Sequence, residues 1–158
     1  MNIGIIGAGQ VGTTLGRGLT RAGHSVTYAQ RDPGRAPPYA GAATASPSAT
    51  AAAAEVLLLA TPFHAAAEAL RGAGDLRGRV LIDVTNPLGP GLVLTVGHQS
   101  SGAEQIAALA PGAQVVKAFG GIEVLVNNAG TGRGPNDGSN ELYAGQAERA
   151  AQIARGET

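Results

Sequence analysis

The stretch Asn2-Ile-Gly-Ile-Ile-Gly-Ala-Gly-Gln-Val-Gly12 decides the fold of this chain. Its first half is a short apolar run that ends at a glycine, which is typical of a buried parallel β-strand. Residues 10–22 then place Val11, Leu15 and Leu19 at a four-residue spacing, which gives one apolar helical face. The N-terminus therefore predicts a strand, a tight turn and a helix.

Apolar runs and helical segments keep alternating beyond this unit, which points to an open parallel sheet with right-handed crossovers. We predict further strands at residues 25–29, 42–45, 55–60, 79–83, 114–118 and 141–144, and helices shortly after residue 45 and at residues 63–71, 102–110 and 146–155. Residues 84–100 are rich in proline and glycine and are predicted to form a long loop. The expected fold is a single domain over residues 1–158: a Rossmann-like, doubly wound α/β fold with a mainly parallel sheet and helices on both faces.

The glycines of the first turn follow the pattern Gly-x-Gly-x-x-Gly, at Gly7, Gly9 and Gly12. The pattern alone is weak, but here it follows a predicted strand and opens a predicted helix, which is the context of a dinucleotide-binding fingerprint. Gly7 permits the tight turn, Gly9 lets the backbone approach a pyrophosphate, and Gly12 lets the helix pack closely on the strand. The pyrophosphate would lie on the N–H groups at the start of the helix.

The residues after the second strand indicate which dinucleotide is bound. NAD-binding proteins usually place an acidic residue there for the ribose 2′-hydroxyl, whereas this chain has Gln30 followed by Arg31. An arginine pairs bidentately with a 2′-phosphate, which a carboxylate would repel. Asp32 stands before a proline and is interpreted as a turn residue. The sequence therefore favours NADP(H) over NAD(H).

Composition excludes several other functions. Eleven basic and eleven acidic residues give a formal net charge of zero, and a neutral chain without a basic stripe has no electrostatic footprint for nucleic acid. The chain has no cysteine, so thiolate ligands and cysteine nucleophiles are excluded, and the scattered His24, His64 and His98 predict no metal site. No apolar run approaches the roughly 20 residues of a membrane span.

We expect a cytoplasmic protein whose partners are small molecules. A homodimer is left open, because an unpaired edge strand invites association.

Five segments together resemble the NADPH-dependent deazaflavin (coenzyme F-420) reductase family. They are residues 4–12, 22–26, 31–33, 81–88 and 111–119, so the resemblance extends in order over residues 1–119. It implies an NADP(H)-dependent oxidoreductase in which hydride passes directly between the nicotinamide and a deazaflavin. Such a step requires close alignment more than an acid or a base, so we assign no catalytic residue.

The resemblance also implies roles for residues at the carboxyl ends of the predicted parallel strands, where ligands bind in doubly wound sheets. Gly9, Gln10, Val11 and Gly12 would hold the pyrophosphate, and Arg31, beside Gln30, the 2′-phosphate. Ala60, Thr61 and Pro62 would flank the nicotinamide. Thr85, Asn86, Pro87, Lys117 and Phe119 would line the pocket of the second substrate.

Two alternatives remain open. The chain could reduce another small substrate such as a carbonyl or imine, which would require a catalytic acid, and Lys117 or a histidine is the available candidate. It could also be a non-catalytic dinucleotide-binding module, because family members normally continue past the point where this chain ends. Residues 124–130 resemble a segment of short-chain dehydrogenases. We interpret that match as coincidence, because Tyr143 is followed at the required spacing by Ala147 rather than lysine.

Overall fold

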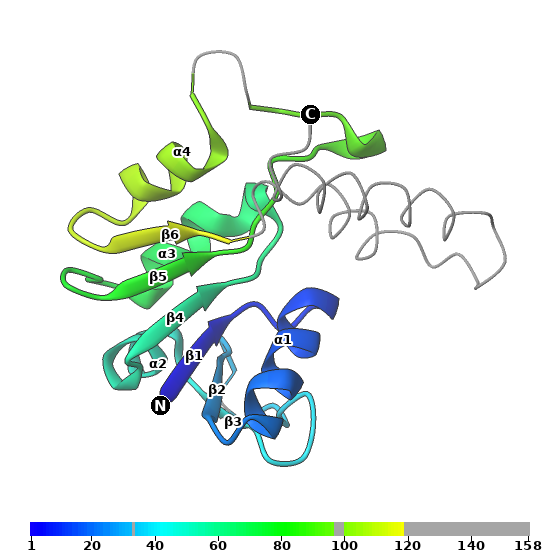
Figure 1. Cartoon of the computed structure of the whole chain (residues 1–158), viewed down its shortest axis with the longest axis vertical. Coiled ribbons are helices and arrows are strands. Elements are labelled where there is room, and N and C mark those ends of the chain that lie inside the picture. Colours follow the sequence, from blue (N-terminus) through cyan, green and yellow to red (C-terminus); the bar gives the residue numbers. More distant parts are fainter. Residues whose placement is uncertain (33, 97–99, 119–158) are drawn as a thin grey trace, which may run out of the picture. The chain divides into compact units, whose positions relative to one another are not determined.

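The computed structural model describes residues 1–32, 34–96 and 100–118, all of which belong to one compact unit, Met1–Ala118. Six strands alternate with helices along this unit, except that a loop, with no helix among its described residues, joins β2 to β3 (Figure 1). The strands are β1 (Asn2–Ile6), β2 (Ser25–Ala29), β3 (Ala43–Ala45), β4 (Val56–Leu59), β5 (Val80–Asp83) and β6 (Gln114–Lys117). The helices are α1 (Gln10–Arg21), α2 (Pro47–Ala53), α3 (Ala66–Ala73) and α4 (Gly102–Leu109), with short 3-10 turns η1 (Phe63–Ala65) and η2 (Pro90–Leu92).

The strands form one sheet in the order β3-β2-β1-β4-β5-β6, and every neighbouring pair is parallel. The order reverses at β1, which pairs with β2 on one side and β4 on the other. In open parallel sheets, ligands bind outside the carboxyl ends of the strands at such a switch point. The glycine turn after β1 therefore lies where this architecture places a ligand.

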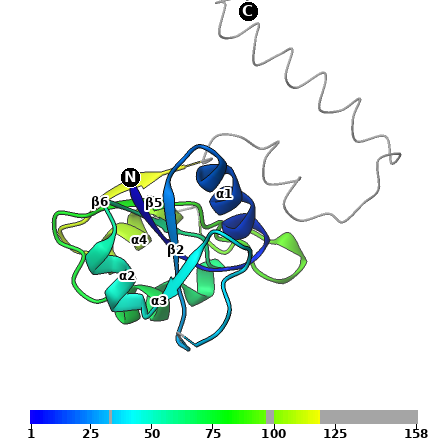
Figure 2. The same ribbon diagram turned by 90° about the horizontal axis from the view of Figure 1, so that it is seen from below.

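Helices cover both faces of the sheet (Figure 2). On one face α2, α3 and α4 bury Ala51, Leu70 and Ile106 against strand residues such as Leu57 and Leu81. On the other face Leu15 and Leu19 of α1 pack against a smaller cluster of buried strand residues, namely Ile3, Ile5, Val26, Tyr28 and Leu58. This alternation follows from the two-residue period of a strand, which sends successive side chains to opposite faces.

The structure confirms the predicted Rossmann-like α/β fold with a parallel sheet and helices on both faces. Two predicted elements differ in detail. The predicted helix over residues 63–71 begins as the 3-10 turn η1 and continues as α3 to Ala73, where Gly74 ends it at a positive φ of 84°. The predicted loop after β5 contains an antiparallel bridge between Leu88 and Leu94, with η2 between the two residues.

The remaining predictions extend outside the described residues. These are the single domain over residues 1–158, the strand at 141–144, the helix at 146–155 and the segment at 124–130. Within the described ranges, none of the helices has the length and apolar character needed to cross a membrane.

A close contact between α1 and β2 sets the position of α1 on the sheet. The hydroxyl of Tyr28, a fully buried residue, donates a hydrogen bond of 2.9 Å to the carbonyl oxygen of Gly12. Burial raises the pKa of Tyr28, so its hydroxyl stays protonated and able to donate. A Cβ at Gly16 would lie 2.0 Å from the hydroxyl oxygen of Tyr28, so only glycine fits there. Gly18, on the same helix, has nothing within 4 Å of an added Cβ.

We predict opposite effects for Gly16→Ala and Gly18→Ala in α1. Gly16→Ala should lower the free energy of unfolding by about 1–3 kcal/mol, because the new methyl group overlaps the Tyr28 hydroxyl. Gly18→Ala should raise it by about 0.5–1 kcal/mol through helix propensity alone. Urea denaturation of the two variants measures both values, and equal stabilisation by the two substitutions would contradict the contact.

Candidate functional site

The glycine turn lies directly against the end of β4. Gly7 has a φ of 114°, and a Cβ there would lie 2.5 Å from the carbonyl oxygen of Ala60. A Cβ at Gly12 would lie 2.1 Å from the carbonyl oxygen of Gly7. The turn, the start of α1 and the end of β4 are thus held together by backbone contact, which requires glycine at both positions.

Gly9 differs from its neighbours because nothing lies within 4 Å of the Cβ that it lacks. It is the N-cap residue of α1 and supplies no side-chain acceptor to the first turn, which contains Gln10 and Val11. The first N–H groups of a helix have no partners within the helix, and the helix dipole favours an anion beside them. The open space and these N–H groups fit the pyrophosphate role expected for the fingerprint.

A hollow of about 560 Å³ adjoins the turn at the end of β2. Its lining runs from the glycine turn to the loop after β2 and comprises Ala8, Ala29, Gln30, Arg31, Asp32, Arg35, Ala36 and Pro38. Gln30 and Arg31, both predicted for the cofactor site, thus lie on one hollow beside the fingerprint. Arg35 was not among the predicted site residues, although its place in the loop after β2 was a signal that could have identified it.

The acidic residue in this lining has a structural role. Asp32 Oδ1 accepts a hydrogen bond of 3.0 Å from the N–H of Gly34, which is the geometry of an Asx turn. The interpretation of Asp32 as a turn residue is therefore confirmed.

The two arginines of this lining differ in their partners. The side chain of Arg31 forms an ion pair with Glu68, whereas that of Arg35 forms no ion pair with the described residues.

The end of β4 brings the next predicted group, Ala60, Thr61 and Pro62, beside the glycine turn. The N–H of Ala60 donates to the carbonyl of Ile6 at 2.8 Å, and the Cβ that Gly7 lacks would lie 2.9 Å from the backbone nitrogen of Thr61. The hydroxyl of Thr61 is buried and has no hydrogen-bond partner among the described residues. The nicotinamide positions expected from the sequence are thus next to the pyrophosphate positions.

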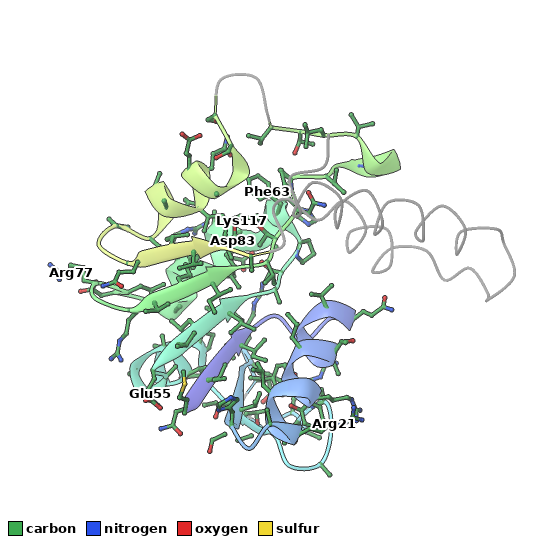
Figure 3. The ribbon with its side chains drawn as sticks, in the orientation of Figure 1. Arg21, Glu55, Phe63, Arg77, Asp83 and Lys117 are labelled. Carbon is green, nitrogen blue, oxygen red and sulfur yellow. The ribbon has the colours of Figure 1, made fainter. Side chains whose placement is uncertain are left out.

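A buried ion pair occupies the ends of β5 and β6 (Figure 3). Asp83 is completely buried, and its Oδ1 accepts a hydrogen bond of 2.8 Å from the N–H of Thr85. Its Oδ2 lies 3.2 Å from Nζ of Lys117, which is its partner in the strand register and also donates to the carbonyl oxygen of Thr85. The side chain of Lys117 is 27% exposed. The pair therefore fastens the turn after β5 to the end of β6.

This arrangement brings together four of the five residues predicted for the second substrate. Thr85 is buried, Asn86 and Pro87 are half-buried, and Pro87 lies beside Gly102 at the start of α4. Lys117 was expected as a ligand, and the structure shows its ammonium group engaged with Asp83 and Thr85. Phe119 lies outside the described residues.

Two of the three histidines can be located. His24 is half-buried directly before β2, at the amino end of the sheet and away from the glycine turn. His64 is exposed in η1, shortly after β4. His98 lies outside the described residues.

Comparison with known proteins identifies the family. Residues 2–87, more than half of the chain, match the family model described as NADP oxidoreductase, coenzyme F-420-dependent. The chain belongs to this family. The description of this family, NADP oxidoreductase, agrees with the class of protein and the dinucleotide predicted from the sequence.

Individual relatives extend this result. A protein described as an F-420-dependent NADP reductase from Arthrobacter sp. FB24 is 36% identical, with a TM-score of 0.67 over 74% of this chain and 61% of that protein. A reductive aminase from Aspergillus terreus in complex with NADPH is 28% identical, with a TM-score of 0.57 over 73% of this chain and 39% of the aminase chain.

A curated relative, the metalloreductase STEAP3 of Rattus norvegicus, is 31% identical over 143 residues, which are 89% of this chain and 28% of that protein. The chain thus spans little more than a quarter of this relative and about three fifths of the Arthrobacter protein.

The buried pair at the ends of β5 and β6 leads to a prediction about stability. Lys117→Met should lower the free energy of unfolding by about 3–5 kcal/mol, because it leaves a fully buried carboxylate without a counter-charge. Asp83→Asn should cost only about 1–3 kcal/mol, because the amide can still accept from Thr85 and water can reach the ammonium group. Urea denaturation at neutral pH measures the free energy of unfolding of both variants. A larger loss in Asp83→Asn than in Lys117→Met would contradict the expected cost of an unpaired buried carboxylate.

Proposed function

We propose that this chain binds NADP(H) and transfers hydride between it and a deazaflavin, coenzyme F-420. The observation that carries the proposal is the hollow at the end of β2, where Arg31 and Arg35 lie beside the glycine turn. The acidic residue there, Asp32, is engaged with the backbone N–H of Gly34. A lining with two guanidinium groups suits a dinucleotide that carries a 2′-phosphate.

The glycine turn fits the rest of the dinucleotide. The spaces that a Cβ would fill at Gly7 and Gly12 are occupied by backbone, whereas the space at Gly9 is open. A pyrophosphate would lie over Gly9 against the N–H groups of Gln10, Val11 and Gly12. From there the ligand would extend in two directions, with its adenosine 2′-phosphate near Gln30 and Arg31 and its nicotinamide near Ala60, Thr61 and Pro62.

The second substrate would then approach from the ends of β5 and β6. NADPH, when bound, supplies the hydride, and the chain's own residues hold the acceptor in line with it. We propose that Thr85, Asn86, Pro87 and Lys117 line this pocket. The Asp83–Lys117 pair would keep the Thr85 turn in place. The ammonium group of Lys117, whose side chain is 27% exposed, would donate a hydrogen bond to an acceptor that gains negative charge when it receives hydride.

A second candidate is the reduction of a different small acceptor. It is favoured by the relatives, which are named as a metalloreductase and a reductive aminase. Reduction of an imine or a carbonyl needs a proton donor, and Lys117 is the half-buried cation at the ends of the strands that would supply it.

The deciding experiment is a pair of fluorescence titrations with NADPH and NADH, followed by addition of oxidised deazaflavin while its absorbance is recorded. Tighter binding of NADPH and bleaching of the deazaflavin would support the proposal. Tighter binding of NADPH without bleaching would favour a different acceptor or a binding module without catalysis. If neither dinucleotide binds, the proposed function is wrong.

We predict that Arg31→Asp weakens NADPH binding by more than about tenfold and leaves NADH binding unchanged, because a charge-assisted bond to the 2′-phosphate is replaced by repulsion. Arg77→Asp is a suitable control, since it changes the net charge equally and lies in an exposed ion pair before β5. Equal losses of affinity for NADPH and NADH in Arg31→Asp would contradict the 2′-phosphate role.

A further inference from the structure

Arg31 is not free in the structure, because it forms an ion pair across the candidate site. Its guanidinium lies 2.9 Å from Oε1 of Glu68, and the two side chains are 83% and 61% exposed. Arg31 follows β2, whereas Glu68 lies in the first turn of α3, which follows β4. The two residues are far apart in the sequence and come from different crossovers.

The position of this pair connects it to the dinucleotide site. In the sheet β1 lies between β2 and β4, and neighbouring strands are about 4.8 Å apart. The Arg31–Glu68 pair therefore links the two segments that flank the glycine turn at the end of β1. Arg31 also lines the hollow beside that turn, so its side chain is within reach of two anions: the Glu68 carboxylate, and the phosphate of a ligand that would occupy the hollow.

We propose that Glu68 competes with the 2′-phosphate of the dinucleotide for Arg31 and thereby sets how strongly the site prefers NADP(H) over NAD(H). This inference rests on the proposed function, in which Arg31 binds the 2′-phosphate. The phosphate group carries up to two negative charges and offers three acceptor oxygens, so it can displace a carboxylate from an arginine. Arg35 lines the same hollow without an ion pair to the described residues, and it would receive the phosphate first.

The energetic effect of Glu68 is expected to be modest and specific. Exposed ion pairs are weak because water and salt screen them, and their loss corresponds to an affinity change of up to about fivefold. A dinucleotide without a 2′-phosphate does not need to displace Glu68 from Arg31. Removing the carboxylate should therefore tighten the binding of 2′-phosphorylated ligands alone.

The test compares Glu68→Gln with the unaltered chain by calorimetric titration of 2′,5′-ADP and 5′-AMP at low salt. These two probes differ in the 2′-phosphate and do not require a second substrate. Binding of 2′,5′-ADP should become about two- to fivefold tighter in Glu68→Gln, and binding of 5′-AMP should not change. The gain should shrink as salt is added, since the pair is exposed.

Two further variants separate competition from general effects of charge. Asp75→Asn is the charge control, because it also removes one negative charge and breaks an exposed ion pair. Oδ2 of Asp75 lies 2.6 Å from the guanidinium of Arg77, and both residues precede β5. Figure 3 shows Arg77 at the opposite end of the sheet from Asp83 and Lys117. Asp75→Asn should leave both affinities unchanged. In the background of Arg31→Gln, the substitution Glu68→Gln should no longer affect 2′,5′-ADP.

Each other outcome overturns the proposal. Unchanged or weaker binding of 2′,5′-ADP in Glu68→Gln would show that Glu68 does not compete for Arg31. An equal gain in Asp75→Asn, or an equal gain for 5′-AMP, would show a general effect of net charge. If the unaltered chain does not prefer 2′,5′-ADP to 5′-AMP, the NADP(H) part of the proposed function fails as well. A clear preference with no response to Glu68→Gln would overturn the role of Glu68 alone.

Discussion

The arrangement of this molecule depends on the close approach of the glycine turn to the end of β4. The positions where Gly7 and Gly12 would carry side chains are filled by the backbone of Ala60 and of Gly7 itself. Any larger residue would separate β1, β4 and the start of α1. Because these elements stay in contact, the turn can present Gly9 outward with open space before it. Tyr28 strengthens the same junction by its hydrogen bond to Gly12.

Two kinds of charge surround this junction, and they have different physical consequences. Beside β2 the charges of Arg31, Arg35 and Glu68 are exposed, so each can exchange partners at little cost. Between β5 and β6, Asp83 is fully buried and Lys117 is mostly buried, so separating them would be costly. We infer that the exposed charges beside β2 suit the selection of a ligand, and that the buried pair between β5 and β6 suits the positioning of a turn.

Much of the fold could be predicted because the signals are local. The sequence predicted all six described strands, most of them from apolar or β-branched runs, and the glycine pattern located the turn at which the strand order reverses. The prediction of one helix over residues 63–71 missed η1. The residues after Pro62 are compatible with a 3-10 turn and with an α-helical turn, and tertiary packing decides between the two. The bridge between Leu88 and Leu94 was missed for a similar reason, since two residues make too short a pattern to recognise.

The sequence by itself determined the Rossmann-like architecture, the fingerprint turn and the position of Arg31 after β2, because each depends on residue types at short spacing. Only the tertiary structure decided that Arg31 faces Glu68 and that Lys117 is held by Asp83 and Thr85. The partners in the first pair are brought together by two different crossovers, and those in the second by the register of β5 and β6. Contacts between residues so distant along the chain have no local signal, since they depend on how the strands are ordered and aligned.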